Sequence, residues 1–182
     1  IIISMETDVS AMFKEIQIVD GQQRLTTSFI FLLALKRVAL EHNNENIAGM
    51  IDDYYLYNRH SSQEALLRLK PAVGNDDTFA HLYYGSYKDL DHNQKETPVY
   101  RNFDYIYRRV EEFSKSWSLA EILDTLGRLD VLSFPLSEDD NAQQIFESIN
   151  STGAPLTSSD LIRNYILMND SSGVQERNYE LY

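Results

Sequence analysis

The sequence predicts a predominantly helical α+β fold, in which a small strand-containing element packs on a multi-helix domain. Two short β-branched runs, at residues 1–4 and 16–19, have the composition of strands. Two strands do not make a stable sheet alone, so we expect further strands upstream of this chain, which does not begin with Met and which we expect to be a fragment. Most of the rest of the 182-residue chain carries apolar residues at helical spacing.

The first half of the chain is expected to hold three helices. Residues 23–41 contain strong helix formers, and apolar residues nearly encircle this stretch, as in a core helix. A second helix is expected at 46–59 and, after an extended segment, a third at 76–84. The polar stretch 86–98 is expected to be a loop.

The second half should contain four helices and one strand. In order, these are an amphipathic helix at 99–117, a shorter helix at 119–129, a strand at 131–136, and helices at 142–150 and 158–168.

Composition limits the functions open to the chain. A net charge of -12 is the wrong sign for a surface that mainly neutralises nucleic-acid phosphates, so any phosphate site must be local. The absence of cysteine excludes disulfides and thiolate metal sites and fits a cytoplasmic protein. The longest apolar stretch, 29–35, is far too short to cross a bilayer, so we expect no membrane partner.

Two other features are interpreted as structural. Most of the tyrosines fall in predicted amphipathic helices, which favours packing in the core or at an interface over base stacking. The pair Arg108 and Arg109 is followed at once by Glu111 and Glu112, so helix-surface ion pairs account for it.

One stretch, IVDGQQRLTT at 18–27, is not explained by packing. A strand that runs through Asp20 and Gly21 into a helix exposes backbone N–H groups at the helix N-terminus, which attracts anions. Gly21 lets the backbone approach a ligand without a Cβ in the way. Arg24, one turn into the helix, can bind phosphate or carboxylate oxygens through its guanidinium fork.

The neighbouring side chains add polar groups to this candidate phosphate site. The hydroxyls of Thr26 and Thr27 and the amides of Gln22 and Gln23 can donate hydrogen bonds there. A carboxylate is repelled by phosphate, so Asp20 must bind a metal ion, orient a water molecule or hold the arginine. The structural alternative is that Asp20 only caps the helix and the arginine is a solvated first-turn residue.

Two motifs give a family resemblance. IVDGQQRLTTSFIFLLAL, residues 18–35, resembles the signature of the DGQQR-motif family, the GmrSD-type restriction endonuclease N-terminal domain. IFESINSTGAPLTSSDLIRNYIL, residues 145–167, is similar to that family's FE-x-x-N-x-x-G-x-x-L-x-x-x-DLI segment. The order and separation of the two motifs also fit, and the resemblance spans most of the chain.

The resemblance implies relatives of the ParB and sulfiredoxin fold, in which a Gly-x-x-Arg turn between a strand and a helix cradles nucleotide phosphates. It implies that residues 1–41 are the C-terminal part of a ParB-like nucleotide-binding domain and that 42–182 form a helical domain, truncated at its end. It further implies a bacterial module that binds and hydrolyses a nucleoside triphosphate with Mg²⁺. This activity would license cleavage of foreign or modified DNA by an HNH-type nuclease domain or subunit.

Roles for the site residues follow from the motif and the resemblance together. Asp20, Gln22 and Arg24 are the candidate catalytic residues, with Asp20 also the candidate metal ligand. The candidate nucleotide-binding residues are Gly21, Gln23, Arg24, Thr26, Thr27, Asn150 and Asp160.

Asn150 and Asp160 lie on polar faces of the two helices in the second motif, and these faces could complete the pocket. The alternative is that Asn150 caps the end of one helix and Asp160 belongs to a capping box with Thr157.

The chain departs from the family pattern at both ends. An IP-x-x-QR-x-Y-like element usually precedes this region and an HNH motif follows in fused members, and neither is in this sequence. We therefore expect the fragment to bind nucleotide weakly or not at all, even if the intact protein is an NTPase. A non-hydrolytic nucleotide or modified-DNA sensor and a ParB-like nuclease remain alternatives, and a homo-oligomer remains open.

Overall fold

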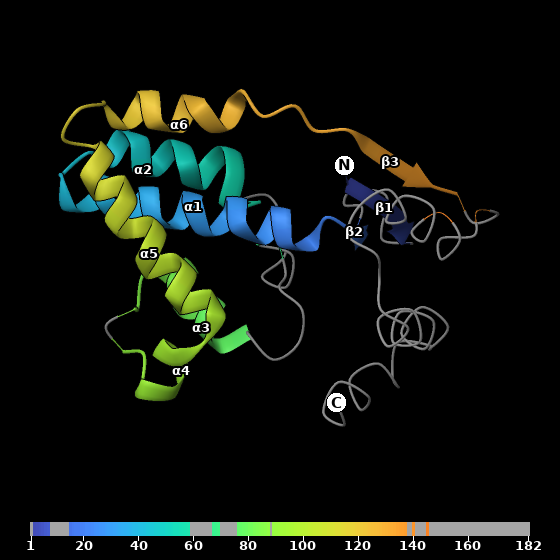
Figure 1. Ribbon diagram of the computed structural model, residues 1–182, viewed down its shortest axis with the longest axis horizontal. Coiled ribbons are helices and arrows are strands. Elements are labelled where there is room, and N and C mark those ends of the chain that lie inside the picture. Colours follow the sequence, from blue (N-terminus) through green and yellow to red (C-terminus); the bar gives the residue numbers. More distant parts are fainter. Residues whose placement is uncertain are drawn as a thin grey trace. The chain divides into compact units, whose positions relative to one another are not determined.

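A computed structural model of the chain describes seven stretches of residues: 2–7, 15–58, 67–69, 76–87, 89–137, 140 and 145 (Figure 1). Its contacts divide the chain into two units, Gln23–Asp130 and the combination of Ile1–Gln22 with Val131–Tyr182. Most of the first long helix, from Gln23 onward, belongs to the helical unit. The predominantly helical α+β class is confirmed.

The strands form one mixed sheet in the order β2-β1-β3. The central strand β1 (Ile2–Thr7) pairs antiparallel with β2 (Glu15–Asp20) and parallel with β3 (Ser133–Leu136). All three predicted strands are therefore present. β1 pairs with β3, which comes from far downstream in the chain, whereas the sequence led us to expect such a partner only upstream.

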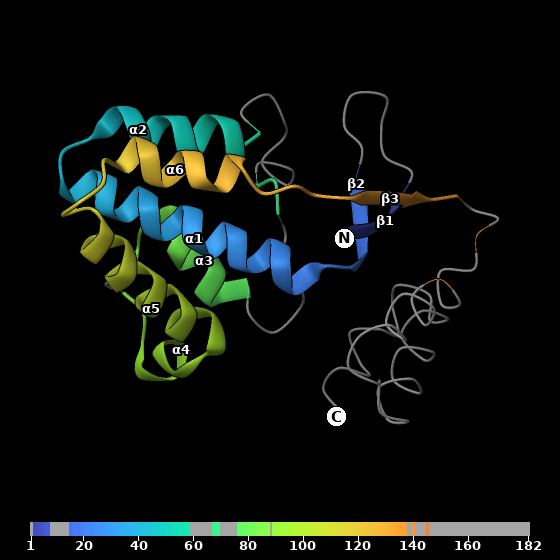
Figure 2. The same ribbon diagram turned by 45° about the horizontal axis from the view of Figure 1, so that its top comes forward.

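Helix α1 (Gln22–Glu41) lies at the centre of the helical unit, with α2 (Glu45–Ile51) and α6 (Leu119–Gly127) on one side of it (Figures 1 and 2). The helices α3 (Asp76–Tyr84) and α5 (Pro98–Phe113) lie on its other side. This central position explains why apolar residues nearly encircle α1 in the sequence.

The predicted helix at 46–59 is confirmed in its first part but changes geometry midway. Asn44 caps α2 by accepting a hydrogen bond from the Ile47 backbone N–H at 3.2 Å. The chain then continues as a π-helix, η1 (Asp52–Leu56), and becomes extended at Tyr57, which pairs with Leu67 in an isolated bridge. Sequence periodicity carries no signal that separates a π turn from an α turn.

The prediction of a loop throughout 86–98 was wrong. A short helix, α4 (His92–Glu96), begins there at a capping box. The Asp91 side chain accepts a hydrogen bond from the Gln94 backbone N–H, and the Gln94 amide oxygen accepts one from the Asp91 backbone N–H. Thr97 then caps α5, with Pro98 at its first position. These capping residues were visible in the sequence, but the lack of apolar residues hid the helix.

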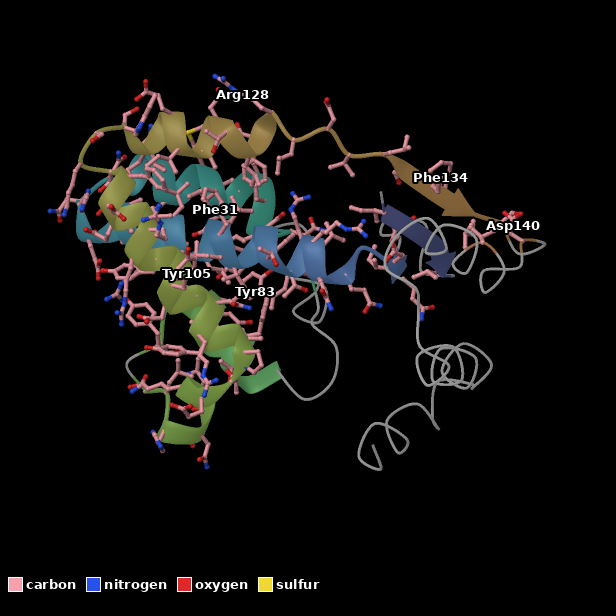
Figure 3. The ribbon with its side chains drawn as sticks, viewed as in Figure 1. Phe31, Tyr83, Tyr105, Arg128, Phe134 and Asp140 are labelled. Carbon is pink, nitrogen blue, oxygen red and sulfur yellow. The ribbon has the colours of Figure 1, made fainter. Side chains whose placement is uncertain are left out.

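The core of the helical unit combines α1 with the helices around it. Its most deeply buried side chains, each 2% exposed or less, include Ile30, Leu35, Val38, Ile51, Leu56, Phe79 and Tyr83. Tyr83 is the centre of an aromatic group, with ring centroids at 5.2 Å from Phe79, 6.1 Å from Tyr57 and 6.4 Å from Phe29 (Figure 3 labels Tyr83).

Tyr57 and Tyr83 differ in what their hydroxyl groups contact. The Tyr57 hydroxyl donates to the backbone carbonyl of Tyr83 at 2.9 Å, and burial, aided by the Asp52 carboxylate, raises the pKa of Tyr57 to about 12. The Tyr83 hydroxyl is buried and makes no hydrogen bond of good geometry in the described part of the chain, although the Leu69 amide lies near it. Burial is the main reason why the pKa of Tyr83 is raised.

Removing these two hydroxyls should therefore have different effects. We expect Tyr57→Phe to lower the free energy of unfolding by about 1 kcal/mol, because it removes a made hydrogen bond. Tyr83→Phe should leave stability unchanged or raise it, because it removes a poorly satisfied buried group. Urea denaturation of both variants checks this, and an equal loss in Tyr83→Phe would contradict it.

Candidate functional site

The DGQQR motif forms a short turn that joins β2 directly to α1. β2 ends at Asp20, and α1 begins at Gln22. Gly21 between them is buried and has a φ of 96°, in the region that favours glycine. The sequence prediction of a strand, a glycine turn and a helix is confirmed at this point.

The first two turns of α1 present several polar side chains to solvent. Gln22, Gln23 and Arg24 are exposed, as is Thr27, whereas Thr26 is half-buried. No acidic residue lies in the first turn of α1, so the positive end of the helix dipole meets no carboxylate within that turn. This arrangement suits an anionic ligand.

Two of the predicted donors are already used inside the motif. The Gln22 amide nitrogen donates to the Ile18 carbonyl of β2 at 2.7 Å. Only the nitrogen can donate to a carbonyl, so this bond also sets the orientation of the amide. The Thr27 hydroxyl donates to the Gln23 carbonyl at 2.8 Å and must rotate to donate to a ligand.

The Ile18 carbonyl is a part of this junction that sequence reasoning missed. A backbone acceptor leaves no side-chain pattern in the sequence, so only the positions of Gln22 and Ile18 in the structure reveal the contact.

Asp20 is half-buried at the end of β2. Within the described residues, no group of three or more His, Asp or Glu side chains is placed to hold a metal ion. A single carboxylate still suits Mg²⁺ that arrives with a triphosphate, because Mg²⁺ commonly uses one or two carboxylates together with substrate phosphates and water. Asp20 therefore fits a metal ion that arrives with a nucleotide.

Asn150 and Asp160, with the helices expected at 142–150 and 158–168, lie outside the described residues. The described part of the site is therefore the β2–α1 junction.

No helix in the described part of the chain is long and apolar enough to span a membrane.

Comparisons with known proteins identify the family of the chain. Searches of curated proteins and of solved structures found no relative. The family described as "GmrSD restriction endonuclease, N-terminal domain" matches residues 2–167, which is most of the chain and includes both motifs. The chain therefore belongs to the GmrSD restriction endonuclease N-terminal domain family, as the two motifs predicted.

Proposed function

We propose that this chain is the NTP-binding, NTP-hydrolysing module of a bacterial restriction system. Membership of the family makes it a restriction-system domain. The observation that carries the nucleotide part of the proposal is the β2–Gly21–α1 junction, where a buried glycine of positive φ opens a helix with an exposed arginine in its first turn. In the intact protein, nucleotide would control cleavage of foreign or modified DNA by an HNH-type nuclease domain or subunit.

The junction has the properties that phosphate binding requires. The first N–H groups of a helix have no partners within that helix, and the helix dipole adds a partial positive charge beside them. The guanidinium of Arg24 supplies a full charge and a planar fork of donors. In a chain with a net charge of -12, these groups offer a local attraction for a small anion rather than a broad basic surface.

The remaining motif residues would then have distinct roles. Gly21, Gln23, Thr26 and Thr27 would contact the phosphates, Thr27 after rotation of its hydroxyl. The Gln22 amide, braced by the Ile18 carbonyl, would present its oxygen away from β2 and could accept a hydrogen bond from the attacking water.

Two further parts complete the proposal. Asp20 would hold Mg²⁺, which when bound offsets the negative charge of the phosphates. Asn150 and Asp160 are proposed to close the other side of the pocket. A cytoplasmic location, where nucleoside triphosphates are found, is part of the same proposal.

Arg24→Ala tests this function directly. Loss of a charged hydrogen bond to phosphate should weaken nucleotide binding by about tenfold or more. Calorimetric titration of ATP and GTP with Mg²⁺ into the chain, and into a longer parent protein, measures the effect. Arg128→Ala is the matched control, because Arg128 is 78% exposed in an ion pair with Asp124 at 2.8 Å and lies outside the motif. Equal nucleotide binding by the folded Arg24→Ala variant and by the same protein without the substitution would refute the phosphate site.

A sensor that binds nucleotide without hydrolysing it is the second candidate. It is favoured by the internal use of the Gln22 amide nitrogen and the Thr27 hydroxyl, which leaves few groups free to act on the reacting phosphate. Phosphate release that Arg24→Ala abolishes would support hydrolysis, whereas binding without turnover by the intact protein would support the sensor. DNA cleavage that needs no nucleotide would instead indicate a ParB-like nuclease, which the acidic charge disfavours.

A further inference from the structure

Three large aromatic side chains are exposed on α5 and the turn after it. Tyr105, Phe113 and Trp117 are 65%, 47% and 57% exposed, so none of these rings is packed in the core of the helical unit (Figure 3 labels Tyr105). The side of α5 that faces the core is supplied by other residues, chiefly Val99, Phe103 and Val110. Core packing therefore accounts for Tyr83 but not for these three rings.

Arginines flank these rings at helical spacing. Arg101 precedes Tyr105 by four residues, and Arg108 and Arg109 follow it by three and four, so guanidinium groups lie one turn before and one turn after the tyrosine. We refer to Arg101, Tyr105, Arg108, Arg109, Phe113 and Trp117 as the α5 arginine–aromatic face.

Residues in the C-terminal part of this face contact one another. The Arg109 guanidinium lies over the Phe113 ring, with its carbon 5.1 Å from the ring centroid. The Trp117 backbone N–H donates to the Phe113 carbonyl at 2.9 Å, which places the tryptophan one turn further on.

Each arginine of the face is held by an exposed ion pair. Arg101 pairs with Glu96, Arg108 with Asp104 at 2.8 Å, and Arg109 with Glu112 at 2.5 Å. Exposed ion pairs of this kind contribute little to stability, so an arginine can exchange its carboxylate partner for a phosphate group at a small cost in free energy. The ion pairs that the sequence predicted are thus present, but they do not prevent the arginines from binding an anion.

We propose that the α5 arginine–aromatic face binds single-stranded DNA. Aromatic rings stack on unpaired bases, and interleaved arginines meet the phosphates between them, which is the combination that single-strand binding surfaces use. Gln23–Asp130 carries 13 of the 16 lysines and arginines and 16 of the 28 aspartates and glutamates, a net charge of -3, whereas the rest of the chain carries -9.

The charge of the face also argues for a single strand rather than a duplex. Asp104 and Glu112 balance much of the arginine charge, so the attraction of the face for phosphate alone is weak. Binding must therefore come mainly from stacking on bases, and duplex DNA offers no unpaired base on which the rings can stack. The proposal does not depend on the nucleotide site, because it involves no residue of the DGQQR motif.

The single tryptophan of the chain provides the measurement, since its fluorescence comes from the proposed face itself. Titration with a short deoxythymidine oligomer should quench Trp117 fluorescence to saturation. Tyr105→Ala should raise the dissociation constant about fivefold or more, as expected for loss of one stacked base. Tyr54→Ala is the matched control, because Tyr54 is 68% exposed on η1, outside the face, and should leave the constant unchanged.

A second variant tests the exchange of ion-pair partners. Glu112→Gln removes the carboxylate that pairs with Arg109 and should tighten binding. Absence of saturable quenching, or an unchanged constant in folded Tyr105→Ala protein, would overturn the proposal. Equal affinity for duplex DNA would contradict the proposal that the rings stack on unpaired bases. Quenching of Trp117 fluorescence that depends on protein concentration in the absence of DNA would instead identify an interface between copies of the chain.

Discussion

Gly21→Val is expected to abolish nucleotide binding and to lower the free energy of unfolding by about 1–3 kcal/mol. Gly21 is buried and has a φ of 96°, a conformation that a β-branched residue rarely adopts. Valine must therefore either strain the turn or shift the start of α1, and either change displaces the N–H groups and Arg24 together. Urea denaturation measures the stability change, and calorimetry with Mg²⁺-nucleotide measures the loss of binding.

Gly49→Ala is the control for this variant. Gly49 lies within α2, and a Cβ added there would meet no atom within 4 Å. Alanine should raise stability by about 0.5–1 kcal/mol, because glycine is the poorer helix former, and should leave nucleotide binding as it was. A Gly21→Val protein as stable as the parent would show that the turn tolerates a side chain, and retained nucleotide binding would separately argue against the proposed phosphate site.

Leu35→Ala is expected to lower the free energy of unfolding by about 2–5 kcal/mol. Leu35 is fully buried at 0% exposure on α1, the central helix of the helical unit, so truncation leaves a cavity that neighbouring helices can fill only in part. A loss of this size is a large fraction of the stability of an ordinary domain. Chemical denaturation, followed by circular dichroism, gives the value.

Leu40→Ala makes the same truncation on the same helix at a position that is 49% exposed. Its effect should be within about 0.5 kcal/mol of zero, because a surface substitution removes little buried area. Similar losses for the two variants would mean that α1 is not packed as the core helix. The comparison also tests the central position of α1 separately from any ligand.

The DGQQR junction could be predicted from the sequence because all its parts are local. A β-branched run, an Asp-Gly pair and a long run of helix formers define a strand, a turn and a helix over a few neighbouring residues. The internal hydrogen bonds could not be predicted. Whether Gln22 points to a ligand or back to the Ile18 carbonyl depends on side-chain rotamers, which residue types do not specify.

The sequence by itself determined the family, the fold class and most of the helices and strands, since these depend on motifs and on periodicity along the chain. Only the tertiary structure decided that β3 pairs with β1 and that α1 belongs to the helical unit, because both depend on contacts between residues far apart in the sequence. It likewise decided which aromatic residues are buried. Tyr83 and Tyr105 both lie in helices, and only the packing of neighbouring elements covers one ring and leaves the other exposed.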